Sequence, residues 1–355
     1  MKVSFVLPFF ARRASGGVKV IYEYSNYLVS SGHQVVIYYT YGNMLSDYAI
    51  PAPLKSFMIK YIIEKSTISW FSLDNRVKRK SIKEIVDSQI DDGDVVIATA
   101  VKTAKPVLLL GQEKGAKVYF IQGFENWSCK NEEVIATYKF KIKKIVVAKW
   151  LKEIVDRYSE QESILIDNSI DLNVFNITVI PEERDNHSIV FQYRSQAYKG
   201  PGCAKKVIDI LYRKYPDLHV FIVSNEKQSC SFPECCSYFY NLTPNEVAEV
   251  NNRARIFMCT SVEEGFGLPG LEAMACGCIL ASTEYKGVLE YAINGENALL
   301  SPINDFESLA DNISRIFEDS DLRSHLLRNS INKAKERTIE ASGLALENIL
   351  ISLQE

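Results

Sequence analysis

Residues 260–277 read Thr-Ser-Val-Glu-Glu-Gly-Phe-Gly-Leu-Pro-Gly-Leu-Glu-Ala-Met-Ala-Cys-Gly and directly follow the apolar run 256–259. The apolar run predicts a buried strand. After two glycines the segment has the start and stop signals of a helix, with Pro269 in the first turn and a glycine just past the end. We therefore expect Glu264 on the loop at the carboxyl end of the strand and Glu272 in the first turn of the following helix.

This strand, turn and helix offers the groups that bind a nucleotide sugar. Helix N-termini favour phosphate, glycines let backbone approach a ligand closely, and a carboxylate can accept two hydrogen bonds from a vicinal diol such as ribose. The pattern Glu264-Gly-Phe-Gly-Leu-Pro-x-x-Glu272 resembles the glutamate, seven residues, glutamate motif of retaining glycosyltransferases of family 4. The alternative is a generic strand, turn and helix whose two glutamates are only solvated.

Strand-like apolar runs alternate with helical patterns in both halves of the chain. Such alternation predicts α/β domains with parallel sheets and right-handed crossovers. The predicted strands are 3–7, 34–39, 94–98, 117–122, 145–148 and 164–166 in the first half, and 189–193, 219–223, 238–240, 256–259 and 279–281 in the second. The family resemblance implies the GT-B fold, in which two Rossmann-like domains face each other across a deep interdomain cleft.

The predicted domains are an N-terminal acceptor-binding domain over 1–175 and a C-terminal nucleotide-sugar-binding domain over 186–338. The polar stretch 168–186 interrupts the alternation with Asp, Asn and Pro residues, so it is the predicted linker. The resemblance implies that the last helix, about 340–355, packs back on the N-terminal domain.

Composition agrees with a two-domain globular protein. The chain has 355 residues, 47% of them apolar and 24% charged, and a formal charge of −3. Such a charge gives no overall attraction to nucleic acid, and no apolar run is long enough to predict a membrane span. The eight cysteines fit neither a disulfide framework nor a zinc site by their spacing, which favours a reducing cytoplasm.

Two cations follow the first strand of the second half. Arg194 comes directly after that strand, and Lys199-Gly200 follows after four intervening residues. The arrangement resembles the Gly-Arg, four residues, Lys-Gly pattern of the family, with Tyr193 in place of the first glycine. Two fixed cations can stabilise the charge that develops on a departing diphosphate. The alternative is an Arg and a Lys that are merely solvated on a loop.

The first half offers two loops that resemble family positions near the donor and acceptor. Gly16-Gly17 precedes a predicted helix, although paired glycines alone usually mark a turn. The second loop carries Gln122 and Glu125, where many relatives have a histidine and this chain has none. Gln122 could bind sugar hydroxyls, and Glu125 could orient the acceptor or take its proton. A loop glutamate in water is an equal alternative.

The resemblance implies front-face substitution, in which the leaving phosphate oxygen helps to take the acceptor proton and Glu264 binds the donor sugar and its oxocarbenium-like transition state. The candidate catalytic residues are Glu264, Arg194, Lys199 and Glu125, and the candidate donor-binding residues are Gly16, Gly17, Gln122, Gly265, Phe266, Gly267, Leu268 and Glu272. No Asp-x-Asp pair follows a predicted strand, so we expect neither a metal nor a cofactor beyond a UDP-, dTDP- or GDP-linked sugar substrate.

The expected activity is retaining transfer of a hexose or deoxyhexose to a growing glycan, which the resemblance to bacterial surface-polysaccharide enzymes suggests is lipid-linked. A sugar-nucleotide epimerase of the same architecture and a non-catalytic glycan-binding subunit are the alternatives. Basic and aromatic residues within 139–152 and the run Arg76-Val-Lys-Arg-Lys80 are candidates for docking on an anionic membrane. The expected location is therefore cytoplasmic, with peripheral attachment to the inner face of the plasma membrane.

Overall fold

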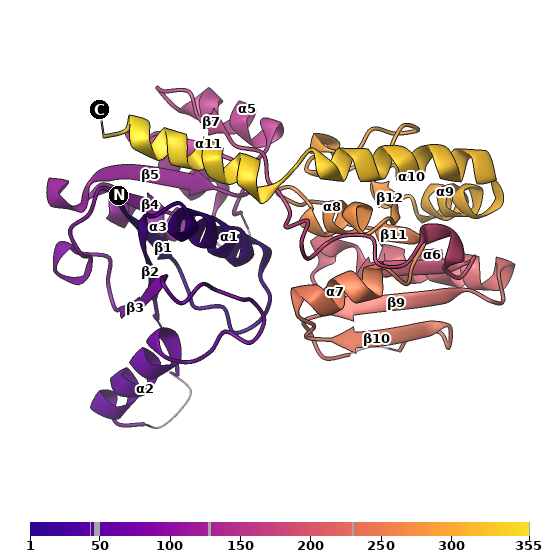
Figure 1. Cartoon of the computed structure of the whole chain (residues 1–355), viewed down its shortest axis with the longest axis horizontal. Helices are drawn as coiled ribbons and strands as arrows, with labels where there is room; N and C mark the ends of the chain where they lie inside the picture. The colour runs from indigo at the N-terminus through magenta and orange to yellow at the C-terminus, as the bar shows by residue number, and fades with distance from the viewer. Residues whose placement is uncertain (43, 46–49, 127–128, 229–230, 355) are drawn as a thin grey trace. The chain divides into compact units, whose positions relative to one another are not determined.

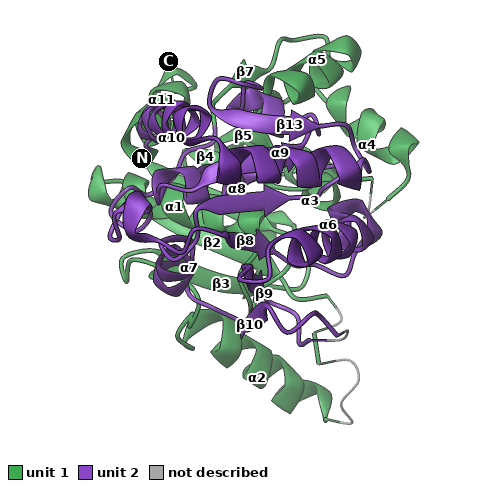
Figure 2. Cartoon of the chain, turned by 90° about the vertical axis from the view of Figure 1, so that its right-hand side faces the viewer, with its two compact units in different colours: residues 1–167, 339–355 green, residues 168–338 purple. Residues whose placement is uncertain are grey.

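The computed structural model describes residues 1–354, apart from 43, 46–49, 127–128 and 229–230. The chain divides into two compact units, unit 1 with residues 1–167 and 339–355 and unit 2 with residues 168–338 (Figure 2). In each unit a sheet of parallel strands is flanked by helices (Figure 1). This is the α/β, Rossmann-like organisation that the alternating sequence pattern predicts.

Unit 1 contains a seven-stranded sheet in the order β3-β2-β1-β4-β5-β6-β7. Its strands are β1 (Lys2–Leu7), β2 (Gln34–Thr40), β3 (Lys78–Ile82), β4 (Val95–Ala98), β5 (Ala116–Ile121), β6 (Lys143–Val146) and β7 (Ile164–Leu165). Its helices are α1 (Gly16–Ser30), α2 (Ala52–Glu64), α3 (Val101–Leu108), α4 (Asn131–Tyr138), α5 (Lys149–Tyr158) and α11 (Ile339–Ser352).

Unit 2 contains a six-stranded sheet in the order β10-β9-β8-β11-β12-β13. Its strands are β8 (Ser188–Gln192), β9 (His219–Ser224), β10 (Cys236–Tyr240), β11 (Ile256–Cys259), β12 (Ile279–Thr283) and β13 (Ala298–Ser301). Its helices are α6 (Pro201–Lys214), α7 (Pro244–Asn251), α8 (Leu268–Ala275), α9 (Phe306–Glu318) and α10 (Ser320–Lys335).

In both units the chain starts at a central strand, adds strands toward one edge of the sheet, and then crosses back to add strands toward the other edge. In unit 1 the reversal lies between β1 and β4, and in unit 2 between β8 and β11. The loops that leave two such neighbouring strands diverge to opposite faces of the sheet, so a crevice opens at their carboxyl ends, and ligands of doubly wound folds bind there. The loops after β8 and β11 are the ones that carry Arg194, Lys199 and Glu264.

The predicted linker is wrong, because residues 168–186 belong to unit 2. Ile170 and Phe175 are buried, and Ile170 forms a parallel bridge with Thr338. Arg184 is also buried, and its guanidinium donates to the carbonyl oxygens of Ala254 and Cys276 at 2.8 and 2.6 Å. The polar composition of the stretch concealed these anchors, so the boundary falls after residue 167 and not at 175.

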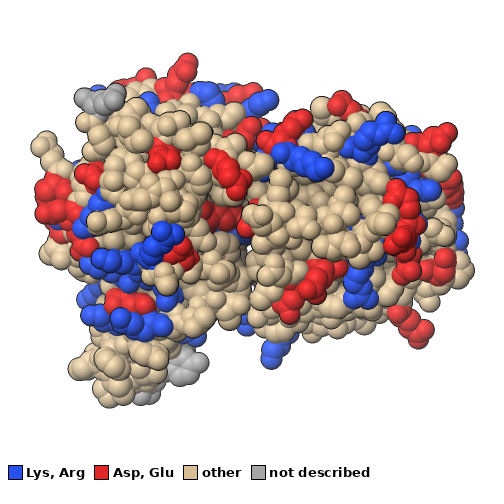
Figure 3. Space-filling view, in the orientation of Figure 1, with Lys and Arg blue, Asp and Glu red and all other residues tan. Residues whose placement is uncertain are grey.

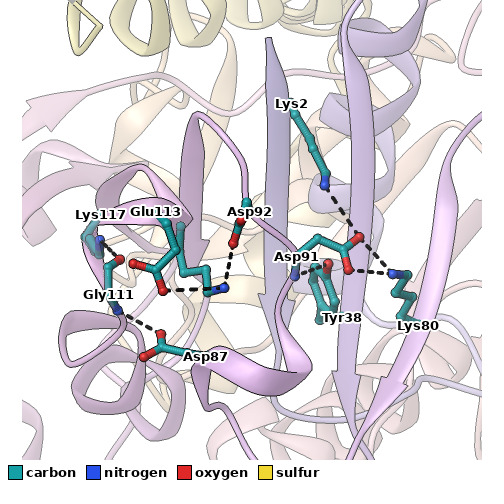
Figure 4. A network of polar contacts seen from close by, with 10 residues as sticks. Lys2, Tyr38, Lys80, Asp87, Asp91, Asp92, Gly111, Glu113 and Lys117 are labelled. Atoms are coloured by element: carbon teal, nitrogen blue, oxygen red, sulfur yellow. Dashed lines mark hydrogen bonds and ion pairs between the residues drawn. The ribbon is translucent and has the colours of Figure 1, made fainter.

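The basic run Arg76–Lys80 is not a free surface segment, because β3 begins at Lys78 and forms the edge of the unit 1 sheet. Lys80 Nζ lies 2.7 Å from both carboxylate oxygens of Asp91, and Lys2 Nζ lies 3.5 Å from one of them (Figure 4). The backbone N–H of Asp91 donates to Tyr38 Oη at 3.0 Å. Through Lys80, Tyr38 and Lys2, Asp91 therefore ties the loop before β4 to β3, β2 and β1.

The last helix, α11, belongs to unit 1, as the sequence analysis predicts. It packs against α1, where a Cβ added to Gly343 would meet the ring of Tyr27 at 2.4 Å. Glu347 accepts from Tyr27 Oη at 3.2 Å and contacts His33 Nε2 at 2.7 Å. Unit 1 is therefore built from two segments that are distant in sequence.

Candidate active site

Glu264 is held on the loop after β11 by partners on both of its carboxylate oxygens. Ser261 Oγ donates to Oε1 at 2.5 Å, and Lys199 Nζ lies 3.1 Å from Oε2. The side chains of Glu264 and Lys199 are 15% and 25% exposed, so the ion pair is shielded from water but reachable by a ligand. The structure thus brings together two of the residues that the sequence analysis assigns to the site.

Hydrogen bonds to backbone carbonyls fix the β8 and β11 loops to each other. The N–H of Val262 donates to the carbonyl of Tyr198 at 2.7 Å, and Thr260 Oγ1 donates to the carbonyl of Lys199 at 3.1 Å. On the other side, Thr283 at the end of β12 donates to the carbonyl of Ser261 at 2.5 Å. The positions of Lys199 and Glu264 are therefore set by these hydrogen bonds between the loops and do not depend on their ion pair alone.

Two glycines are required where these loops enter helices. Gly200 has φ 66°, and a Cβ built there would lie 2.0 Å from the carbonyl oxygen of Thr260. Gly267 has φ 91°, and a Cβ there would lie 2.0 Å from Tyr285 Oη. Its carbonyl accepts from Tyr291 Oη at 2.7 Å. Only glycine fits both the left-handed conformation and the close approach, which explains two glycines of the sequence motifs in structural terms.

Arg194 extends from the end of β8, with Nη1 donating to the carbonyl of Tyr193 at 2.8 Å. Burial lowers the pKa of Arg194 from its ordinary value, and the carboxylates of Glu226 and Glu264 oppose that lowering. Glu226 also accepts from the backbone N–H of Ser195 at 3.0 Å. A partly buried guanidinium can hold a diphosphate through charge-assisted hydrogen bonds.

The sequence analysis did not identify Glu226 as a site residue. Glu226 lies just past the end of β9, so it occupies the same edge of the sheet as Arg194 and Glu264. Tyr238 Oη donates to its backbone carbonyl at 2.7 Å, and its own N–H donates to Ser224 Oγ at 3.0 Å. A search for charged residues after every predicted strand could have found it.

Glu272 is buried, with 6% of its surface exposed, and it lies on α8. Because α8 begins at Leu268, Glu272 lies in the second turn and not in the first, which corrects the sequence prediction. Phe266 and Leu268 are also buried, and Phe266 packs on the ring of Tyr291 at 5.2 Å between centroids. The side chains of Phe266 and Leu268, two of the donor-binding candidates, therefore hold the loop in place. Gly265 and Gly267, two further candidates, lie in the same turn.

In unit 1, the Gly16–Gly17 pair forms the start of α1. Neither glycine has a positive φ, and no described atom lies within 4 Å of a Cβ built on Gly16. Gln122 Nε2 donates to the carbonyl of Gly17 at 3.1 Å. The pair therefore begins a helix and does not form a turn, and its backbone does not require glycine. Gly17 and Gln122, two donor-binding candidates from distant segments, lie together.

Glu125, on the loop after β5, is turned toward α3. Its Oε2 accepts from the backbone N–H of Val101, the first residue of that helix, at 3.1 Å. Burial raises the pKa of Glu125 to about 7, against the opposing effects of this hydrogen bond and of Lys102. Glu125 is therefore not a solvated loop carboxylate, and its pKa suits transfer of a proton near neutral pH.

The basic segment 139–152 is partly used by the fold. Lys144 is buried and donates to the carbonyl of Phe140 at 2.7 Å and to Ser159 Oγ at 3.0 Å. Lys152 pairs with Asp156, and Lys141 pairs with Glu160 on the exposed surface. Among the residues that the structure describes, no helix is long and apolar enough to cross a membrane, and no group of three or more His, Cys, Asp or Glu could hold a metal ion.

Residues 176–335 match the family described as glycosyl transferases group 1. The matched range lies within unit 2 and includes Arg194, Lys199, Glu264 and Glu272. The residues of this site therefore lie inside the segment that defines the family.

Two curated relatives are enzymes of bacterial glycan assembly by name. The chain is 28% identical over 113 residues to the N,N'-diacetylbacillosaminyl-diphospho-undecaprenol alpha-1,3-N-acetylgalactosaminyltransferase of Campylobacter jejuni, covering 31% of this chain and 30% of that protein. It is 22% identical over 162 residues to the capsular polysaccharide biosynthesis glycosyltransferase CapM of Staphylococcus aureus, covering 43% of each. The chain thus spans less than half the length of either relative.

The fold is similar to a solved structure over nearly the whole chain. Anabaena Alr3699/HepE in complex with UDP and glucose has a TM-score of 0.73, 13% identity, and coverage of 99% of this chain and 100% of that one. The chain thus has the two-unit α/β fold of GT-B glycosyltransferases, and the segment of unit 2 over residues 176–335 matches the group 1 family. At 13% identity, this similarity concerns the fold alone.

Proposed function

We propose that the chain is a retaining, metal-independent glycosyltransferase that moves a hexose or deoxyhexose from a nucleotide sugar to a lipid-linked bacterial surface glycan. The observation that carries the proposal is the set of charges at the carboxyl edge of the unit 2 sheet. Lys199 and Glu264 are ion-paired there, and Arg194 lies close enough for Glu226 and Glu264 to influence its pKa. A donor has both a dianionic diphosphate and a neutral sugar, and this edge offers partners for each.

In this proposal the two cations bind the diphosphate and stabilise it as it leaves. Lys199 already has Glu264 as a partner, so the diphosphate would share its ammonium group. Glu264 would then be free to accept hydrogen bonds from the sugar and to stabilise the positive charge at the anomeric carbon. Glu272 would accept from ribose hydroxyls, and the N-terminus of α8 would bind the phosphates. The solved relative with UDP and glucose supports a UDP-linked donor.

Unit 1 would bind the acceptor. A groove of about 1150 Å³ runs between α3 and α4 and includes Val101, whose N–H binds Glu125. Lys102, Lys105 and Lys130 line the same groove. Lysines can neutralise the phosphate of an acceptor, and a carboxyl with a pKa near 7 can orient its hydroxyl or take its proton.

The lipid-linked nature of the acceptor is supported by the names of the relatives. The Campylobacter jejuni enzyme is named for a diphospho-undecaprenol acceptor, and CapM is named for capsular polysaccharide. We propose that this chain likewise works on the cytoplasmic side of the plasma membrane, as a peripheral protein.

A panel of UDP-, dTDP- and GDP-linked sugars, each with and without a lipid-linked acceptor, tests the proposal. Transfer that requires both substrates, persists in chelator and gives a product with the anomeric configuration of the donor is the expected result, read by mass spectrometry and NMR. Interconversion of the nucleotide sugar without acceptor would instead indicate an epimerase. Binding without turnover of any donor would indicate a glycan-binding subunit.

A further inference from the structure

Helix α2 exposes large apolar side chains on the side that faces away from the rest of unit 1. Leu54, Phe57 and Tyr61 are 51%, 67% and 59% exposed. The opposite side of the helix is packed, with Ile59 and Ile63 buried. At the place where Figure 1 labels α2, the space-filling view shows a projecting part that is mostly neither basic nor acidic (Figure 3). A helix that is apolar on opposite faces is normally covered on both.

The exposed side chains form one continuous face. With about 100° of rotation per residue, Leu54, Phe57 and Tyr61 fall within about 60° of one another, and Ile59 and Ile63 lie on the opposite side. The C-terminal end of α2 is fixed to the sheet, because Glu64 accepts from the backbone N–H of Ser81 at 3.0 Å. The exposed face is therefore held in a constant orientation on unit 1.

Lysines flank this face on both sides. The same rotation places Lys55 and Lys60 at the two borders between the exposed and the packed side. Lys65 follows at the exposed end of the helix. Glu64 is the one acidic residue of α2, and its carboxylate is engaged by Ser81. An apolar face between two cationic borders is the arrangement that lies in the interface of an anionic bilayer, where long lysine side chains reach the head groups.

A second copy of the chain fits this face less well. Paired by twofold symmetry, the bordering lysines of the two copies would be brought toward one another, which is unfavourable. A stable dimer also buries about 800 Å² per partner, far more than three side chains on one helix supply. An anionic lipid surface complements the lysines and needs no such area.

We propose that α2 docks the protein on anionic membrane, with Leu54, Phe57 and Tyr61 inserted among the lipids and Lys55 and Lys60 at the head groups. The proposal rests on the proposed function in one respect, since a lipid-linked acceptor is met at a membrane surface. It assigns the attachment to α2 and not to the basic segments 76–80 and 139–152, in which Lys80, Lys144 and Lys152 are engaged by other groups of unit 1.

Flotation of the full chain with vesicles tests the assignment. Vesicles of phosphatidylcholine with phosphatidylglycerol should carry the wild type upward, whereas phosphatidylcholine alone should not. The double variant Leu54→Gln/Phe57→Gln should lower the partition coefficient at least about tenfold, because apolar insertion is lost while helix propensity is kept. Leu109→Gln, which changes a 71% exposed leucine elsewhere on unit 1, should float as the wild type does.

A charge variant separates the two contributions. Lys55→Gln/Lys60→Gln should weaken flotation on anionic vesicles, more at low salt than at high salt. Lys205→Gln/Lys335→Gln, on the exposed surface of unit 2, is the matched control. Wild-type flotation of both α2 variants would overturn the assignment, as would a wild type that never binds anionic vesicles. Loss of self-association in the α2 variants, measured by sedimentation with no change in flotation, would show a dimer contact instead.

The outcome is independent of the test of activity. A protein that transfers sugar to a detergent-solubilised acceptor but does not float would overturn the docking assignment alone. A protein that floats through α2 but binds no nucleotide sugar would overturn the proposed function alone.

Discussion

The two sheets of this chain share one order over six strands, to which unit 1 adds β7, but they differ in how acids are held at their carboxyl edges. In unit 2, Glu264 is paired with Lys199 and hydrogen-bonded to Ser261. In unit 1, Glu125 occupies a comparable place after a strand, but burial raises its pKa to about 7 and its partner is a backbone N–H. Similar topology thus gives two different edges. The unit 2 edge carries ion-paired acids and bases, and the unit 1 edge carries a carboxyl whose pKa is close to neutral pH.

The difference suggests a division of labour between the two edges. A set of fixed charges suits a dianionic diphosphate whose charge grows in the transition state, because such groups need no reorganisation during the reaction. A carboxyl with a pKa near 7 suits a neutral hydroxyl that must lose a proton. Changes at the two edges should therefore have different kinetic and pH signatures.

The largest effect should come from Arg194→Ala. Removal of a cation that acts on the leaving diphosphate should lower kcat by about 10²- to 10³-fold, while the protein stays folded. Steady-state kinetics with the identified donor give the measurement. Arg328→Ala, on the exposed surface of α10, is the control and should keep the wild-type rate. A near-wild-type rate for Arg194→Ala would remove this residue from the site.

The two acids of the motif should separate binding from turnover. Glu264→Ala should mainly lower kcat, and Glu272→Ala should mainly weaken donor binding, by about tenfold or more, because it is assigned to the ribose. Calorimetric titration of donor and kinetics read the two effects. Glu263→Ala changes an exposed neighbour and should alter neither. Equal donor affinities and unchanged rates in both variants would contradict the assignment.

The rigidity of the unit 2 edge can be tested with one glycine. Gly267→Ala should lower the free energy of unfolding by about 3 kcal/mol or more, because strain in the left-handed region adds to a clash with Tyr285. Gly295 also has a positive φ, but no described atom lies within 4 Å of a Cβ built there. Gly295→Ala should therefore cost only about 1–2 kcal/mol. Equal losses in urea denaturation would show that the close approach is unimportant.

The free energy of unfolding should depend on pH through Glu125 at the unit 1 edge. The pKa of Glu125 is raised from 4.5 to about 7, so its contribution to stability is complete below about pH 4.5 and is lost as the pH rises through about 7. Glu125→Gln stays neutral, so its unfolding free energy relative to the wild type should increase by about 2–3 kcal/mol between these limits. Glu133→Gln, on the exposed side of α4, should follow the wild type. Parallel curves for Glu125→Gln and the wild type would show that this carboxyl is not perturbed.

The smallest effect should come from Gly16→Ala. Because the backbone there needs no glycine, the substitution should raise the unfolding free energy by about 0.5–1 kcal/mol. If the donor approaches the backbone closely at Gly16, the added methyl group should also lower the affinity for the donor. Higher stability with unchanged donor affinity would restrict donor binding to unit 2.

Motifs with a strong local requirement were predictable from the sequence, and long-range contacts were not. The motif at 264–272 fixed the strand, the loop and the helix, since Gly267 and Pro269 each have a local conformational reason. The edge strand β3 was missed because its sequence Lys-Arg-Lys-Ser-Ile has no apolar alternation, and the partner of Lys80, Asp91, is distant in sequence. The pKa of Glu125 was equally hidden, because burial depends on segments distant in sequence.

The docking of α11 on α1 has a consequence for biosynthesis. Unit 2 is one continuous segment, 168–338, whereas unit 1 needs the residues that follow it. On the ribosome, unit 2 can therefore finish folding while unit 1 still lacks its last helix. Until Glu347 emerges, the surface around Tyr27 and His33 remains uncovered, which makes this half of the nascent chain the one that most needs protection by chaperones.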